Sequence, residues 1–172
     1  DVARETGTYR TGWGWAGKFF DYDNDGWLDL YVVNGWVSAG EENYIVDIFK
    51  LIIQPDLDMS DARIWPPMGN KTLSGYQKNV LFHNQGGDLF KNEAARHGLD
   101  SQLDARGVAV VDFDNDGRLD MFISNANTEP LLVRNAQPTG RHWIQFLLEG
   151  VHSNRDAVGA RASIIVNGQR RL

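Results

Sequence analysis

One acidic nine-residue pattern occurs twice in the chain, and it constrains the fold more than any other feature. The first copy runs from Asp21 to Asp29 and the second from Asp112 to Asp120, and the copies stand 91 residues apart (112 − 21 = 91). Each copy places four Asp within nine residues. Carboxylates this close together repel one another unless a cation lies between them. Ca²⁺ takes six to eight oxygen ligands from a flexible loop, so each copy is interpreted as a calcium loop.

The expected ligands of the two sites follow from their positions in the loop. Side chains at the first, third, fifth and ninth positions converge when the backbone curls, and the seventh residue lends its carbonyl oxygen. No Cys or His stands within either loop, so zinc and copper are not expected. The predicted ligands are Asp21, Asp23, Asp25, the Trp27 carbonyl and Asp29 in the first site, and Asp112, Asp114, Asp116, the Arg118 carbonyl and Asp120 in the second.

Three other interpretations of the acidic pattern were weighed. An EF-hand loop needs a bidentate Glu at position 12, where this chain has Val32 and Ile123. The run from Val108 to Asp114 resembles the nucleophile strand of haloacid-dehalogenase phosphatases, but the pattern occurs twice and returns directly to a strand. An acidic turn without metal remains the third alternative. Short β-branched and aromatic runs flank both loops, so each loop is expected to join two strands of a hairpin.

The repeat extends well beyond the loops. Residues 1–35 match residues 92–126 without a gap at the same offset of 91, and Leu81–Asn84 match Leu132–Asn135 at an offset of 51 (132 − 81 = 51). The first copy therefore carries 40 extra residues (91 − 51 = 40), which fall between about 35 and 78. Without this insertion the period is near 50 residues, which is typical of propeller blades.

Each repeat unit is expected to hold four short strands, which is the content of one propeller blade. In the first unit the expected strands cover about 15–20, 28–34, 79–84 and 88–92. Within the insertion, apolar residues recur at helical spacing from Glu41 to Ile53, and Pro55 would end a helix there. The predicted fold class is all-β: propeller blades with a short helix in the insertion.

These residues carry a family resemblance. The paired acidic loops, the lead-in from Gly12 to Trp15, and Asn79–Asn84 followed by Gly-Gly-Asp-Leu-Phe resemble FG-GAP/VCBS repeats, the blades of integrin-α-type β-propellers. The segment from His142 to Arg161 resembles the start of an ASPIC/UnbV domain. The resemblance implies propeller repeats over 1–138, with the insertion at about 35–78, and the start of a truncated C-terminal β domain over 139–172.

Length limits how much of a propeller the chain can form. Its 172 residues hold about two blades, whereas a closed propeller typically needs four to eight. The chain is therefore expected to be part of a longer polypeptide. Open blade edges are templates for strand pairing, so the remaining blades are expected from the rest of that polypeptide or from a partner.

Charge and composition exclude several classes of function. The net charge is −6 and the two loops hold eight Asp, so the rest of the chain sums to +2 (−6 + 8 = +2). No basic stripe with interleaved aromatic residues suggests nucleic-acid binding, and no apolar run approaches the roughly 18 residues of a membrane span. There is no Cys, and the four His are scattered without a carboxylate at ligand spacing, so each His is expected to be structural.

The predicted function is a non-catalytic, calcium-stabilised propeller module for binding, adhesion or scaffolding. Extracellular, cell-surface or periplasmic localisation is expected because calcium is abundant there, and the expected partner is a protein or glycan ligand or the remaining blades. Two alternatives are a lectin-like propeller, with exposed aromatic residues such as Trp36 and Trp65, and a non-catalytic subunit of a larger enzyme complex.

Overall fold

A computed structural model describes residues 2–138, 140–152 and 154–171. The chain divides into two compact units, Asp1–His142 and Trp143–Leu172. The prediction had placed a boundary after residue 138, four residues before the division between the units. Nearly all regular structure is antiparallel sheet, and the fold class is all-β, as predicted. Among the described residues, no helix has the length and apolar character needed to cross a membrane.

The first repeat unit forms a four-stranded antiparallel sheet in the order β1-β2-β3-β4. The strands agree with the predicted ones to within two residues at each end. In the pairing of β2 with β3, Tyr31 lies opposite Leu81, so the two strands that flank the insertion are neighbours in the sheet. The strands are β1 (Gly14–Phe20), β2 (Asp29–Asn34), β3 (Val80–Asn84) and β4 (Phe90–Asn92).

The second repeat unit forms a three-stranded sheet from β5 (Ala105–Val111), β6 (Asp120–Asn125) and β7 (Leu131–Val133). Its register repeats that of the first sheet, since Phe122 faces Leu132 as Tyr31 faces Leu81. The 3₁₀ helix η2 (Ala94–His97) precedes it, and the helix α1 (Ala3–Thr6) stands at the matching place before the first sheet. The structure thus repeats at the offsets seen in the sequence.

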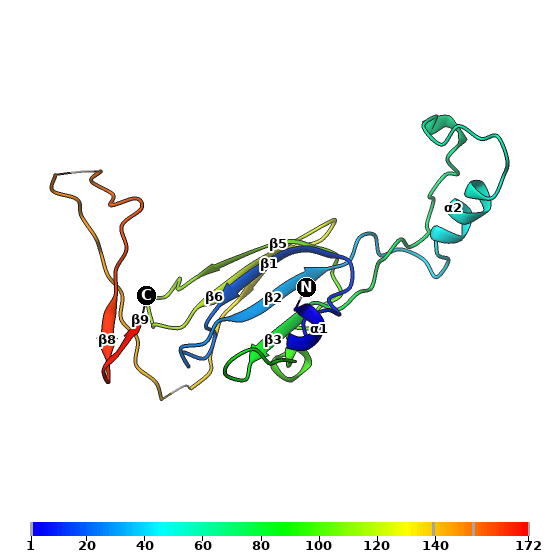
Figure 1. Ribbon diagram of the computed structural model, residues 1–172. Coiled ribbons are helices and arrows are strands. Elements are labelled where there is room, and N and C mark those ends of the chain that lie inside the picture. Colours follow the sequence, from blue (N-terminus) through cyan, green and yellow to red (C-terminus); the bar gives the residue numbers. More distant parts are fainter. Residues whose placement is uncertain (1, 139, 153, 172) are drawn as a thin grey trace. The chain divides into compact units, whose positions relative to one another are not determined.

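The two sheets pack against each other, with β1 beside β5 (Figure 1). The β1–β3 face that points to the second sheet buries Phe20, Tyr31 and Leu81, and the β5–β6 face that meets it buries Val108 and Ile123. Alternate residues of each strand point to this shared core, as the two-residue period of a strand requires. The hydroxyl of Tyr31 donates to the carbonyl of Leu99 at 2.9 Å, so its polar end is satisfied within the core.

The insertion between β2 and β3 contains the predicted helix, α2 (Ile45–Ile52), and a 3₁₀ turn, η1 (Ala62–Ile64). The helix begins later than the apolar spacing suggested. At the base of the insertion, Asp104 Oδ1 accepts a hydrogen bond of 2.7 Å from the Ser38 hydroxyl, and Arg106 Nη1 donates to the Gly35 carbonyl at 2.8 Å. Residues of the second repeat therefore fix the start of the insertion.

In the second compact unit, β8 (Ile164–Val166) and β9 (Gln169–Arg171) form a hairpin. Asn167 and Gly168 join them with φ angles of 51° and 78°. Positive φ at both turn residues is the conformation that favours Asn-Gly in two-residue hairpins. Asn-Gly at this position thus accounts for the tight turn between β8 and β9.

Candidate metal centres

Each acidic loop joins the first two strands of its sheet. In the first loop, Phe20 pairs with Asp29, so the two ends of the nonapeptide lie opposite each other across β1 and β2. The backbone reverses between them with φ of 58° at Asn24 and 87° at Gly26. Asn and Gly are the residues that tolerate the left-handed conformation. The second loop repeats these values at Asn115 and Gly117, with φ of 57° and 82°.

The first Asp of each loop fixes the turn by accepting two backbone hydrogen bonds. Asp21 accepts from the N–H groups of Asp25 and Gly26 at 2.9 and 2.7 Å. Asp112 does the same with Asp116 and Gly117, at 3.0 and 2.9 Å. The repeated network holds the loops in one conformation, in which the intervening Asp side chains lie within the turn.

The last Asp of each loop is buried and ties the loop to β3 in the first sheet and to the segment just after β7 in the second. Asp29 accepts from the N–H of Tyr22 at 3.1 Å and from the N–H of Asn84 at 2.8 Å. Asp120 accepts from Phe113 at 3.1 Å and from Asn135 at 2.7 Å. Sequence reasoning assigned no role to Asn84 and Asn135, although their match at an offset of 51 marked them as equivalent.

The Asn side chains complete this connection. Asn84 Nδ2 donates to the Leu28 carbonyl at 3.2 Å, and Asn135 Nδ2 donates to the Leu119 carbonyl at 3.3 Å. Asn135 Nδ2 also donates to the carbonyl of Tyr22 at 2.6 Å, which links the first loop to the second repeat. Each acidic loop is therefore held at both ends by backbone and side-chain hydrogen bonds that do not depend on an ion.

The structure brings most of the predicted side-chain ligands together. Ligand atoms of Asp21, Asp23 and Asp29 lie within 4.8 Å of one another, as do those of Asp112, Asp114 and Asp120. Asp25 joins Asp23 in a further group. Asp116 instead forms ion pairs with Arg118 and Arg134. The participation of the Trp27 and Arg118 carbonyls stays a prediction.

Burial and mutual repulsion raise the pKa values of two carboxylates in the first loop, Asp21 and Asp29. Burial raises the pKa of Asp29 to about 6, against hydrogen bonds from Asn84 and Tyr22 that lower it. Burial and the charges of Asp25 and Asp23 also raise the pKa of Asp21. Burial acts on Asp116 in the same direction, but the Arg118 N–H and the guanidinium groups of Arg118 and Arg134 lower its pKa overall. The pKa values of Asp21 and Asp29 in the first loop are therefore raised, whereas that of Asp116 in the second loop is lowered.

A guanidinium lies against each loop. Arg141 Nη1 is 3.0 Å from Asp23 Oδ1 and 3.9 Å from Asp25 Oδ2. Arg134 Nε is 2.7 Å from Asp114 Oδ2 in the second loop. Both Arg side chains are about half exposed, and ion pairs at this exposure contribute little stability. In each loop, a positively charged Arg side chain thus stands next to the carboxylates that are predicted to bind a metal ion.

The donor set fits a hard divalent cation. The converging atoms in both loops are carboxylate oxygens, which are the preferred ligands of Ca²⁺. In the first loop Asp23 Oδ1 is buried and pairs with the Arg141 guanidinium at 3.0 Å, so an ion bound there would take the place of that cation. A bound Ca²⁺ would supply positive charge to offset the repulsion among the Asp side chains.

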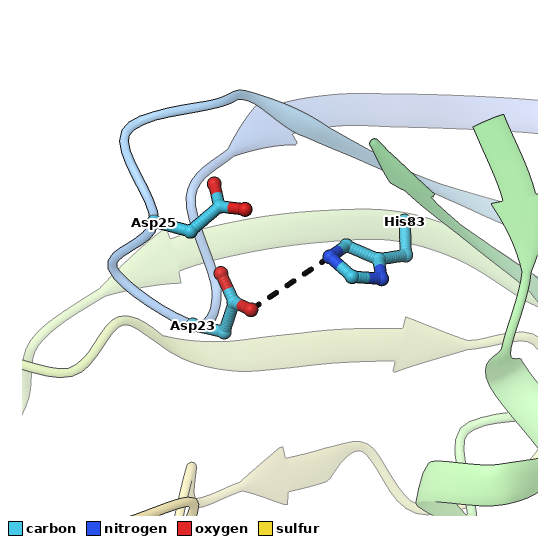
Figure 2. Close-up of side chains that lie close together, drawn as sticks. All are labelled: Asp23, Asp25 and His83. Carbon is cyan, nitrogen blue, oxygen red and sulfur yellow. Dashed lines mark ion pairs between the residues drawn. The ribbon is translucent and has the colours of Figure 1, made fainter. Parts of the chain in front are cut away.

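The structure also places His83 beside the first loop, although no carboxylate stands at ligand spacing from it in the sequence. His83 Nε2 lies 3.7 Å from Asp23 Oδ2 (Figure 2). The pairing of β2 with β3 brings His83 there from a distant part of the sequence. The match of Leu81–Asn84 to Leu132–Asn135 at an offset of 51 was the sequence signal that could have placed the strand of His83 in the same repeat unit as the first loop.

Comparison with known proteins supports the repeat assignment. The model of the FG-GAP-like repeat family matches residues 71–123, which include the second acidic loop. These residues therefore have the character of an FG-GAP-like repeat, a unit of propeller-type folds. The ASPIC/UnbV resemblance of the C-terminal segment stays a prediction.

Two curated relatives share part of the chain. Cartilage acidic protein 1 of Mus musculus is 46% identical over 50 residues, and cartilage acidic protein 1 of Homo sapiens is 44% identical over 50 residues. Each alignment covers 28% of this chain and 8% of the relative. The matched part is therefore a small portion of the length of either relative.

Proposed function

We propose that this chain is a calcium-stabilised, non-catalytic propeller module of an extracytoplasmic protein, which acts in binding, adhesion or scaffolding. The observation that carries the proposal is the repetition of one hydrogen-bond network in both acidic loops. The same four backbone N–H positions donate to the first and last Asp in each loop, and the third residue of each loop, Asp23 or Asp114, brings a ligand atom within 4.8 Å of those two Asp. A calcium ion would offset the repulsion among these carboxylates in both loops.

Calcium is proposed to act on stability rather than on a reaction. Binding only to the folded state stabilises it by RT ln(1 + [L]/Kd), which is about 2.7 kcal/mol at a hundredfold excess of ion over Kd. Extracellular calcium is abundant enough to fill such sites, which supports an extracellular, cell-surface or periplasmic location. The similarity to relatives whose name refers to cartilage agrees with this location.

The free face of the second sheet supports the view that further blades pack on this chain. On the first sheet, Tyr31 and Leu81 are buried against the second sheet. Their repeat equivalents Phe122 and Leu132 are 43% and 59% exposed. The second sheet also has three strands against four in the first, among the described residues, so its β7 edge is open. Remaining blades of a longer polypeptide are the proposed occupants of this face.

A lectin-like role is the second candidate, and one surface feature favours it. The indole rings of Trp13 and Trp36 stack at 4.7 Å, and Trp15 meets Trp36 edge to face at 6.0 Å. Trp13 and Trp15 are both partly exposed, and Arg106 lies over the Trp15 ring. Exposed aromatic faces next to hydrogen-bonding groups are suited to a sugar ring.

Calcium titration followed by thermal unfolding tests the main proposal. The melting temperature of the protein should rise with calcium and fall when a chelator is added. An unchanged melting curve in chelator would contradict the proposal. For the lectin candidate, a glycan array should show binding that is lost in Trp13→Ala and kept in Asp114→Ala. Binding that tracks the Asp residues instead would contradict it.

A further inference from the structure

We infer that the first acidic loop is a mixed oxygen and nitrogen site that binds a borderline divalent transition metal, such as Co²⁺ or Zn²⁺, through Asp23, Asp25 and His83. The second loop offers only oxygen ligands and keeps the preference for calcium. The inference rests on the proposed function in that both loops are taken to bind divalent ions. It adds that the two loops differ in the kind of ion they select.

The geometry of His83 is that of a third ligand. Ligand atoms of Asp23, Asp25 and His83 all lie within 4.8 Å of one another, and the imidazole of His83 points toward the two carboxylates (Figure 2). Two ligands about 2.1 Å from one ion can be at most about 4.2 Å apart. The 3.7 Å between His83 Nε2 and Asp23 Oδ2 is within that limit.

The Nε2 atom of His83 is buried and has no hydrogen-bond partner among the described residues. A distance of 3.7 Å to Asp23 Oδ2 is too long for a hydrogen bond. Asp23 Oδ1 is also buried and pairs with Arg141 Nη1 at 3.0 Å. A metal ion that displaced Arg141 would contact both Asp23 and His83 Nε2.

The opposite ring nitrogen has a carboxylate nearby. His83 Nδ1 accepts a hydrogen bond of 3.0 Å from Gln85 Nε2 and lies 3.6 Å from Glu93 Oε2. The side chain of Glu93 is only 7% exposed. Metal-binding His commonly directs its second ring nitrogen to a carboxylate, which fixes the tautomer and the ring orientation. Metal binding at Nε2 would require the ring proton to lie on Nδ1, where the Glu93 carboxylate 3.6 Å away is the nearby acceptor.

Arg141 does not prevent this role. Its guanidinium pairs with Asp23 and Asp25, but the side chain is 44% exposed. A surface ion pair of this kind is worth about 0–1 kcal/mol. A divalent ion held by two carboxylates and an imidazole can therefore replace it.

The second loop provides an internal comparison. Arg134 stands at the position equivalent to His83 and pairs with Asp114 and Asp116. A guanidinium has no lone pair for a metal, so this loop is left with carboxylate and carbonyl oxygens. Imidazole suits transition metals, whereas an all-oxygen set suits Ca²⁺. The exchange of one residue between the repeats thus accounts for different ion preferences.

Co²⁺ binding to the intact protein tests the inference, because its visible absorption reports nitrogen ligation directly. The wild-type protein should bind one Co²⁺ tightly, and His83→Asn should weaken that binding by at least about 10 to 100-fold. Calcium titration of the same variant should still show two sites, which also verifies that it folds. Arg134→His is the matched gain of function and should create a second tight Co²⁺ site.

The outcomes separate this inference from the calcium proposal. Equal Co²⁺ affinity in the wild type and His83→Asn would overturn it, even if both loops bind calcium. A similar loss of Ca²⁺ and Co²⁺ affinity in His83→Asn would also overturn it, since His83 would then not select between ions. If Co²⁺ binding depends on His83 while neither loop binds calcium, the transition-metal site stands and the calcium proposal fails.

Discussion

Asn24 Nδ2 donates a hydrogen bond of 3.1 Å to the carbonyl oxygen of Gly117, so the two acidic loops are in direct contact. Both residues lie at the turn of their loop and both have the left-handed backbone conformation. This hydrogen bond joins the turns of the two candidate metal sites.

Asn24→Gly should weaken this contact without disturbing the turn, because glycine accepts the positive φ at that position. We expect the free energy of unfolding in saturating calcium to fall by about 1 kcal/mol, the usual value of a neutral hydrogen bond. Denaturant unfolding measures the change. Asn115→Gly is the control, since Asn115 occupies the same place in the second loop and is exposed. Equal losses in both variants would argue against the contact.

Removal of one predicted ligand should disable one site and leave the other. Asp23→Ala should eliminate ion binding at the first loop, and Asp114→Ala should do so at the second. Isothermal titration with calcium should count two sites in the wild type and one in each variant. The melting temperature of each variant should still respond to chelator, but by less than that of the wild type. Two sites remaining in Asp23→Ala would refute the assignment of the first loop.

The pH dependence of the first site follows from Asp29. Its pKa is raised to about 6 by burial in the ion-free fold, whereas an unfolded Asp has its ordinary value near 3.8. The folded state therefore holds this proton more tightly than the unfolded state. The resulting stability is present below the unfolded pKa and is lost as the pH rises through about 6.

Ion binding should show the opposite trend with pH, because a metal ligand must be deprotonated. We expect the calcium affinity of the first loop to fall as the pH is lowered through about 6. Titration of Asp114→Ala, which keeps only the first loop, at several pH values isolates this effect. The ion-free protein should in the same range gain stability at lower pH. An affinity that is flat between pH 5 and 7 would contradict the role of Asp29.

The sequence predicted the repeats and the acidic loops because both depend on local spacing. The offset of 91 places Asp21 and Asp112 at equivalent turns of the two repeats. The sequence did not predict that His83 approaches Asp23, because that contact depends on the pairing of β2 with β3 across the insertion. The contact of Arg141 with the first loop was missed for a similar reason, since 118 residues separate Arg141 from Asp23.

The exposed face of the second sheet gives the last prediction. Leu81→Ala should destabilise the protein by about 2–5 kcal/mol, since it removes a fully buried side chain from the core between the sheets. Its repeat equivalent Leu132 is 59% exposed here, so Leu132→Ala should cost less than about 1 kcal/mol if nothing covers that face. If a further blade packs on it in the intact protein, as proposed, Leu132→Ala should approach the cost of Leu81→Ala. Denaturant unfolding of both variants in the intact protein distinguishes the two cases, and a negligible effect of Leu132→Ala there would show that no blade occupies the face.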